Sequence, residues 1–333
     1  MQLARFVAGR LGSVIVVLLI VSFATYALFY LAPSDPAQLS CGRPCTPQSL
    51  AAAKAFMGFD SPWWQQYLTF LGAIFVGRTF GTGVTAIHCA APCFGYSFQE
   101  NATVNSLIAS RLPVTLSLAI GAAVIWLSLG VAIGVLSALK NGSALDRITM
   151  AGAIAGVSAP AYLVGLLAIL VFGFTLNIVP VSGYVPVTTS PVDWAWHLVT
   201  PWLVLAFINA AIYARLTRTQ MLEVLGEDFI RTARAKGLPE RKVVGKHALR
   251  NVLLPVITVF GIDLGSLLGG AIITEQVFSM PGLGALLVSA VHQLDLPLLL
   301  GCTLFASFAV TIANFLVDLL YGVLDPRARL VGS

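Results

Sequence analysis

The chain alternates between long runs of apolar residues and short segments that carry nearly all of its charge. The first run, LGSVIVVLLIVSFATYALFYLA at residues 11–32, contains no charged side chain. About 20 apolar residues in a helix cross the roughly 30 Å hydrocarbon core of a bilayer. The pattern predicts an all-α polytopic membrane protein with six transmembrane helices, at residues 11–32, 112–139, 148–175, 194–214, 251–275 and 296–318.

Composition argues against other broad classes. Of the 333 residues, 58% are hydrophobic and 10% are charged, and the mean hydropathy is +0.89. A soluble protein of this length cannot hide so much apolar surface in one or two cores. A transmembrane barrel would show short segments of alternating polarity, and the sequence shows none. The first run follows two arginines, as in a signal peptide, but it is longer than a signal core and no A-x-A cleavage pattern follows it. We therefore read it as a retained span.

The distribution of Lys and Arg predicts the orientation. With the N-terminus inside, 15 of the 19 cations lie on the cytoplasmic side, as the positive-inside rule requires. The four others are Arg43, Lys54, Arg78 and Arg111. We expect both termini in the cytoplasm of a multi-pass protein of the cell membrane. The net charge of +5 is then an orientation signal and not a sign of nucleic-acid binding.

The predicted spans divide the chain into four parts. Residues 1–32 hold the N-terminal segment and first span, 33–110 an extracytoplasmic segment, 111–325 the transmembrane core, and 326–333 a cytoplasmic tail. Glycines recur every four residues inside the core, a spacing that lets helix backbones approach closely in lipid. These glycines are Gly130 with Gly134, Gly152 with Gly156, and Gly261 with Gly265 and Gly269.

Four cysteines lie in the extracytoplasmic segment as two C-x-x-x-C patterns. Cys41 and Cys45 form CGRPC, and Cys89 and Cys93 form CAAPC. Thiols outside the cytoplasm oxidise, so we expect disulfides, although four cysteines allow three pairings and the sequence does not choose among them. His88 beside one cysteine raises the alternative of a metal site. Two C-x-x-x-C patterns match zinc spacing only loosely, so we expect no metal.

No constellation of residues predicts catalysis in this chain. The four histidines are scattered, and GKH at residues 245–247 lacks the first glycine and the Ser/Thr of a phosphate-binding loop. Ionisable groups inside spans are costly and are therefore candidates for a transport path. Asp263 lies in the fifth predicted span, Glu275 near its outer end, and Asn314 and Asp318 on the sixth. An ion-coupled carrier would be built from such groups, but these are few and form no obvious relay.

Nine of the 19 cations fall between Arg215 and Arg250, in the loop 215–250 that joins spans four and five. Gly237 suits the end of one helix and Pro239 the first turn of the next, so we expect helix, tight turn and helix here. The second helix has a weakly apolar face made of Val243, Val244, His247 and Ala248. A solvated loop that meets anionic lipid explains the charge but not this order, which favours a docking element for a protein partner.

The loop resembles the cytoplasmic coupling loop of permease subunits in ABC importers, and more closely that of the oligopeptide and dipeptide (B-type) subunits of peptide importers. The matching motifs are FIRTARAKGL, HALRNVLLPV, RLPVTLSLAI, SAPAYLVG, TEQVFSMPGLG and VDLLYGVLDPRAR, and they extend over nearly the whole chain. Where the wider importer pattern E-A-A-x-x-x-G has an acidic residue, this chain has Arg231, in the Arg-Thr-Ala form of the peptide branch. The cysteine-bearing segment is not matched to the family.

The resemblance implies a path-forming subunit that is not itself an enzyme and holds no cofactor. A second homologous permease would enclose the path, two ATPase subunits or domains would bind ATP and Mg²⁺, and an extracytoplasmic binding protein would deliver peptides. The residues implied to couple this chain to the ATPase are Arg231, Thr232, Ala233, Arg234, Ala235, Lys236, Gly237, Leu238 and Pro239. Those expected near the path or its outer gate are Asp263, Gly265, Gly269, Glu275, Pro281 and Gly282.

Other interpretations stay open at this point. The same kind of machine carries nickel chelates or oligosaccharides in related systems. An ion-coupled secondary carrier predicts dependence on an ion gradient, no ATPase partner, and internal repeats or broken helices, which the sequence does not reveal. A membrane scaffold or receptor subunit predicts no flux at all. Co-purification of an ATPase would separate the first interpretation from the last two.

Overall fold

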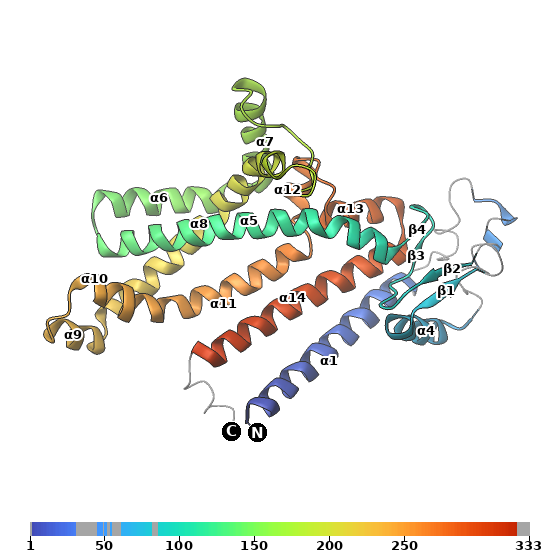
Figure 1. Cartoon of the computed structure of the whole chain (residues 1–333), viewed down its shortest axis with the longest axis horizontal. Helices are drawn as coiled ribbons and strands as arrows, with labels where there is room; N and C mark the ends of the chain where they lie inside the picture. The colour runs from blue at the N-terminus through green and yellow to red at the C-terminus, as the bar shows by residue number, and fades with distance from the viewer. Residues whose placement is uncertain are drawn as a thin grey trace. The chain divides into compact units, whose positions relative to one another are not determined.

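The computed structural model describes residues 2–30, 45–48, 50–51, 54, 61–81 and 86–324 (Figure 1). The predictions made for Cys41 and for the tail 326–333 fall outside these residues. The chain divides into two compact units. The first comprises residues 1–115, 268–272 and 281–312, and the second comprises residues 116–267, 273–280 and 313–333. Each unit is described by itself.

The first unit combines helices with two small β-hairpins. Its helices are α1 (Gln2–Tyr30), α4 (Trp63–Val76), the beginning of α5 (Val104–Leu139), α13 (Leu283–Gln293) and the beginning of α14 (Leu296–Leu324). In the hairpins, β1 (Arg78–Phe80) pairs antiparallel with β2 (Ile87–Cys89), and β3 (Tyr96–Ser97) pairs with β4 (Ala102–Thr103). An all-α expectation was therefore wrong for this segment, where short runs between glycines and prolines are too brief for helices.

Two clusters of buried side chains hold the first unit together. The larger joins α5, α13 and α14 and consists of Val104, Ile108, Leu283, Leu286, Ala290, Leu298 and Cys302. The smaller packs α4 against the hairpins and consists of Ala73, Phe80, Cys89, Cys93 and Tyr96. The aromatic residues of α4 also meet α1, because the Tyr67 hydroxyl lies 2.8 Å from Ser22 Oγ and the Tyr67 ring lies 5.1 Å from that of Tyr26.

The second unit is a bundle of helices. It contains the rest of α5, α6 (Ala144–Ser158), α7 (Ala161–Ala168), the π-helix η2 (Ile169–Thr175), α8 (Pro191–Gly226), α9 (Asp228–Ala235), α10 (Glu240–Lys242), the π-helix η3 (Val243–Ala248), α11 (Leu249–Leu268) and most of α12 (Ile272–Val277). Figure 1 shows α5 and α6 running side by side, with α8 crossing them at an angle.

Glycines allow α5 to lie directly against α8. A Cβ atom at Gly130 would come within 2.5 Å of Tyr213 Cβ, and one at Gly134 within 2.6 Å of the Ala214 carbonyl oxygen. A Cβ at Gly152, by contrast, would meet nothing within 4 Å. Close backbone approach is the means by which helices associate where burial from water provides no driving force. The first predicted glycine pair is thus a packing feature, whereas Gly152 makes no close contact with the described residues.

Four helices of the described chain are long and apolar enough to cross a membrane: Val104–Leu139, Pro191–Gly226, Glu240–Leu268 and Leu296–Val317. The expected third span is instead two helices, Ala144–Ser158 and Ala161–Thr175, bent by 101°. Pro160 lacks a backbone N–H and forces Ala159 into an extended conformation (ψ 124°), which breaks the helix. Within α1, Gly12–Ala27 is a shorter apolar stretch.

Two boundaries differ from the prediction in ways that affect candidate residues. Helix α11 ends at Leu268, so Gly269 does not continue the ridge of Gly261 and Gly265. Helix α8 does not end at Arg215 but continues to Gly226, which makes the first part of the predicted loop 215–250 an extension of the span.

Candidate functional site

The predicted turn between the two helices of the basic loop is present. Helix α9 ends at Ala235, and Gly237 follows in the left-handed conformation with φ of +74°. The N–H of Gly237 donates to the Arg234 carbonyl at 2.9 Å, and the N–H of Leu238 donates to the Ala233 carbonyl at 3.4 Å. This pair of bonds is the Schellman motif, which satisfies the last carbonyls of a helix and favours glycine at this position.

A salt bridge joins the two helices across the turn. The guanidinium of Arg234 donates from two nitrogens to Glu240, at 3.1 Å from Nε and 2.7 Å from Nη2. Planar two-bond pairing of this kind constrains geometry as well as charge. Pro239 stands at the N-cap of α10, one position before the predicted first turn. The turn is therefore held by backbone bonds and by a side-chain clamp.

The two helices bury one side and expose the other. Ile230 and Ala233 of α9 are buried, as are Val243 and Ala248 of η3, and Val244 and His247 are half-buried. This matches the apolar face predicted for the second helix. Of the residues expected to couple to an ATPase, Ala233 is buried, Leu238 is half-buried, and the exposed ones are Arg231, Thr232, Arg234, Ala235, Lys236, Gly237 and Pro239. Phe229 is also exposed, at 43%.

A buried ion pair ties the extension of α8 to the connection between α5 and α6. Nε and Nη2 of Arg218 donate to Asp146 at 2.6 and 2.8 Å, and Nη2 also donates to Asn141 at 2.8 Å. Asp146 is 4% exposed and also accepts hydrogen bonds from the Ser137 hydroxyl and the Gly142 N–H. Every carboxylate oxygen is therefore partnered, which is what makes a buried charge tolerable.

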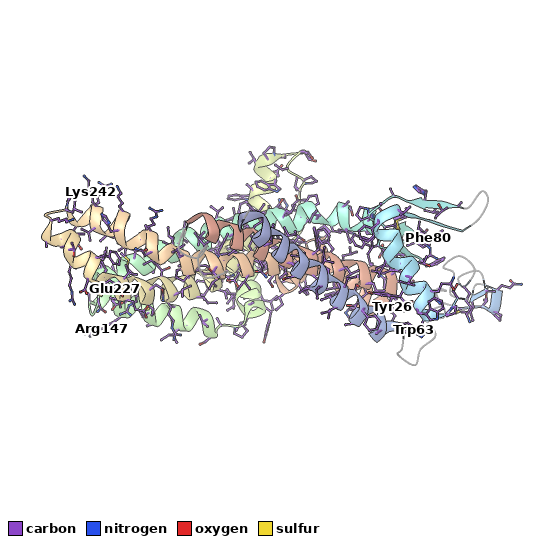
Figure 2. All side chains as sticks on the ribbon, turned by 90° about the horizontal axis from the view of Figure 1, so that it is seen from below. Tyr26, Trp63, Phe80, Arg147, Glu227 and Lys242 are labelled. Carbon is purple, nitrogen blue, oxygen red and sulfur yellow. A yellow bond between two sulfur atoms is a disulfide. The ribbon has the colours of Figure 1, made fainter. Side chains whose placement is uncertain are left out.

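Because of this ion pair, two segments that the charge pattern places on one side of the membrane lie together. They are the α5–α6 connection at residues 140–143 and the part of α8 beyond Arg215 that leads into α9. Figure 2 shows Arg147, Glu227 and Lys242 at one end of the second unit. The sequence analysis did not predict a role for Asp146 or Arg218. The only available signal was that Asp146 is an acid in one basic segment and Arg218 a base in another, so the two could pair.

Asp263 lies inside the α11 span and meets a buried tyrosine of α8. The Tyr213 hydroxyl donates to Asp263 Oδ2 at 2.7 Å. Tyr213 is fully buried, whereas Asp263 is half-buried. The tyrosine was not predicted as a site residue, since a lone Tyr in an apolar helix carries no signal of its own.

The other path candidates lie on separate elements. Gly265 is buried in α11, and Glu275 is fully buried on α12, a separate short helix beyond the end of α11 at Leu268, where the prediction had one span to residue 275. In the turn that follows, the Met280 N–H donates to the Glu275 carbonyl at 2.8 Å, Pro281 is half-buried, and Gly282 is the N-cap of α13. The candidates therefore come from α11, α12, the N-cap of α13 and the turns between these helices.

Backbone contacts near this turn were not predicted. A Cβ at Gly270, whose φ is +130°, would lie 2.7 Å from Gly284 Cα, so two glycines let the chain segments cross in contact. The first N–H of α13, at Leu283, donates to the Thr115 hydroxyl of α5 at 2.9 Å. These contacts join the motifs RLPVTLSLAI and TEQVFSMPGLG within the first unit.

The outer cysteines form disulfides where the structure describes them. Cys89 and Cys93 are bonded, with an S–S distance of 2.07 Å, and both lie in the smaller core of the first unit. Cys45 is also disulfide-bonded, and Cys41 falls outside the described residues. Bonded sulfurs are not available as thiolate ligands, which removes the alternative of a metal site at Cys89 and Cys93.

The fold defines a polytopic helical membrane protein with an ordered helix pair between two of its long helices. Comparison with known proteins gives the family. Residues 130–330 match the family model described as the binding-protein-dependent transport system inner membrane component, and residues 3–119 match the N-terminal model of the same systems. The chain belongs to this family and is a multi-pass protein of the inner membrane.

Several relatives are similar along their whole length. A putative peptide transport system permease protein of Brucella melitensis is 38% identical over 98% of this chain and 99% of its own. The dipeptide transport system permease protein DppB of Escherichia coli K12 is 36% identical over 98% of both chains. The di/tripeptide transport system permease protein DppB of Pseudomonas aeruginosa is 38% identical over 97% of this chain and 98% of its own.

Among solved structures, an inward-facing form of the MetNI methionine ABC transporter contains a chain with a similar fold. The TM-score is 0.52 and the identity is 19%, over 66% of this chain and 97% of that chain. This likeness concerns the fold alone.

Proposed function

We propose that this chain is one of two membrane-spanning subunits of an ATP-driven importer of peptides. Family membership supports the role of permease, and the relatives at 36–38% identity are named for peptide, dipeptide or tripeptide transport. The observation that carries the proposal is the α9–α10 pair. It is an ordered, clamped helix–turn–helix that exposes basic residues and an apolar side chain, beyond the end of a long membrane-spanning helix.

We further propose six spans with both termini in the cytoplasm. The positions of the cations support this orientation, and so does the contact of Arg218 with the α5–α6 connection, which brings two predicted cytoplasmic segments together. In this arrangement the bent pair α6 to η2 is the third span, and the cysteine-bearing hairpins are extracytoplasmic.

In the proposed mechanism this chain changes conformation, and its partner subunits hydrolyse ATP. Two ATPase subunits bind ATP with Mg²⁺, one of them against the α9–α10 pair, and a second permease and a peptide-binding protein complete the complex. Helix α8 is continuous from Pro191 to Gly226, so displacement of α9 acts on a rigid lever that reaches through the membrane. The Arg234–Glu240 clamp makes the helix pair move as a unit, and the Arg218–Asp146 pair links this lever to α5 and α6.

The segment from Asp263 to Gly282 is proposed to border the path or its outer gate. It contains a carboxylate inside a span, a helix end at Leu268, and a turn between short helices. Cysteine crosslinking of Pro281 to the second permease supports this placement, and labelling of the same position by a lipid-phase probe contradicts it.

Docking of the ATPase is tested best at Phe229. Its exposed ring is a candidate anchor, because large apolar side chains surrounded by polar ones contribute most to interfaces. Phe229→Ala should reduce co-purification of the ATPase subunits and the stimulated ATPase rate by about tenfold, the effect of a contact near 1.4 kcal/mol. Thr69→Ala on α4 is the control, since its exposed hydroxyl bonds to the Gln65 carbonyl of its own helix and it is not among the coupling residues.

Charge reversal at Arg234 is a less direct test, because it also breaks the clamp with Glu240. Phe229→Ala avoids this difficulty, since Phe229 takes no part in the clamp. If Phe229→Ala retains the ATPase as fully as Thr69→Ala does, this face is not the docking surface. If no nucleotide-binding subunit accompanies the unaltered chain, the importer proposal itself fails.

A further inference from the structure

The carboxylate of Asp263, in the middle of α11, is held by a hydrogen bond from another helix. Asp263 Oδ2 accepts the Tyr213 hydroxyl at 2.7 Å, and no hydrogen bond or ion pair of the described residues engages Oδ1. Asp263 is half-buried, so Oδ2 is held by Tyr213 while Oδ1 can accept a hydrogen bond from another molecule. Asp263 is thus an oriented acceptor within a membrane-spanning helix.

Three helices cooperate to hold this acceptor. The Tyr213 ring on α8 lies 6.4 Å from the ring of Trp126 on α5, which lies 6.2 Å from Phe260 on α11. Gly130 on α5 provides space for Tyr213, since a Cβ atom at position 130 would lie only 2.5 Å from Tyr213 Cβ. Tyr213 and Trp126 are both fully buried, so the hydroxyl is aimed by packing and not by chance rotation.

The surface of α11 next to Asp263 is left uncovered by the described residues. Ile262 is 51% exposed, and Ser266, three residues after Asp263, is also exposed. This span is also the least covered of the four long apolar helices, with 22% of its apolar window buried against 39–44% for the others. Charged side chains inside spans face a protein interior or a water-filled cavity and not lipid, so another component must meet this face.

We infer that Asp263 binds the protonated amino group of the cargo as it crosses the membrane. The inference rests on the proposed function and names a residue that takes part in cargo selection. An ammonium group carries three donors and a positive charge, which complement the free Oδ1 and the negative charge of Asp263. A peptide that leaves water needs a counter-charge for its amino terminus, because an unpaired charge is poorly tolerated in low dielectric.

The binding step is tested by photo-crosslinking on the complete transporter in nanodiscs. The probe is a dipeptide of alanine and photo-leucine, compared with its N-acetylated form, which has no ammonium group. The free dipeptide should crosslink to peptides of α11 around position 263. Acetylation of the probe or Asp263→Asn should each reduce this yield roughly tenfold, the effect expected for one partly desolvated charge contact.

Two further variants separate cargo binding from a structural role. Tyr213→Phe keeps the packed ring and removes only the hydroxyl, so it should lower the crosslink yield by less than Asp263→Asn does. Thr258→Val is the matched control, because its hydroxyl bonds to the Leu254 carbonyl within α11 and should not matter. Asp263→Glu should keep much of the yield that Asp263→Asn loses.

Each outcome decides the inference. Equal crosslinking of the free and acetylated probes, or of wild type and Asp263→Asn, overturns it. Loss of the second permease from Asp263→Asn preparations also overturns it, since the carboxylate would then pair with a cation of that subunit. Failure of the proposed function looks different, because the unaltered complex would show no ATP-dependent peptide uptake with any variant or probe.

Discussion

The contact between α5 and α8 gives a prediction with a calculable size. In Gly130→Ala the new methyl carbon would lie 2.5 Å from Tyr213 Cβ and 3.2 Å from the Ala210 carbonyl oxygen. Carbon atoms pack at about 3.5–4.0 Å, so the helices must separate by roughly 1 Å at this point. Both nearest atoms are fixed close to the α8 backbone, so no flexible side chain can yield instead. Overpacking of this kind destabilises by about 1–3 kcal/mol.

Gly152→Ala is the matched control for this change. It makes the same substitution in helix α6, where a Cβ would meet nothing within 4 Å. Free energies of unfolding for the purified full chain, measured by SDS titration in mixed micelles, should fall by about 1–3 kcal/mol for Gly130→Ala and change by less than about 0.5 kcal/mol for Gly152→Ala. Equal stability of the two variants would refute the reasoning that glycine at 130 sets the distance between α5 and α8.

Three further predictions concern the turn, the α14 cap and the disulfide. Gly237→Val should insert normally but lose stimulated ATPase activity, because a left-handed conformation costs a non-glycine residue about 1–2 kcal/mol, and Gly237→Asn should retain more activity. Burial raises the pKa of Asp295, so the folded state keeps a proton that the unfolded chain loses above about pH 4. Stability should therefore fall as pH rises from there through the raised pKa, and Asp295→Asn, which still caps α14, should flatten that dependence in pH-resolved melts. Replacing Cys89 and Cys93 together by alanine should destabilise the hairpins by roughly 2 kcal/mol, the loop-entropy value for so short a ring, and hydrogen exchange over residues 78–103 measures it. An unchanged exchange rate in that variant would contradict a structural role for the bond.

Local sequence chemistry was enough to predict the features that depend on one or two neighbouring residues. Gly237 followed by Pro239 predicted the helix–turn–helix, and the structure has the turn with φ of +74° and a buried face behind it. Long charge-free runs predicted the apolar helices, although their ends were displaced wherever a helix continues past the membrane, as α8 does beyond Arg215. The apolar run alone marks the hydrocarbon core and not the full helix.

Features that depend on distant pairs could not be read from the chain. The partners of Arg218 and Asp263 come from other helices, 72 and 50 residues away. The bend at Pro160 was in principle readable, since a proline after two small residues ends a helix, but hydropathy continues smoothly across it. The strands at residues 78–103 were missed because two- and three-residue pairings have no periodicity to detect.

The central claim is that this chain forms half of the path of an ATP-driven peptide importer. The most direct measurement is uptake of a radiolabelled dipeptide into proteoliposomes that contain this chain, its second permease and the ATPase subunits, with the binding protein outside. The account predicts uptake that requires ATP inside the vesicles and ceases when a non-hydrolysable analogue replaces it. Uptake driven by an ion gradient without ATP, or no uptake by an intact complex that hydrolyses ATP, would contradict the claim.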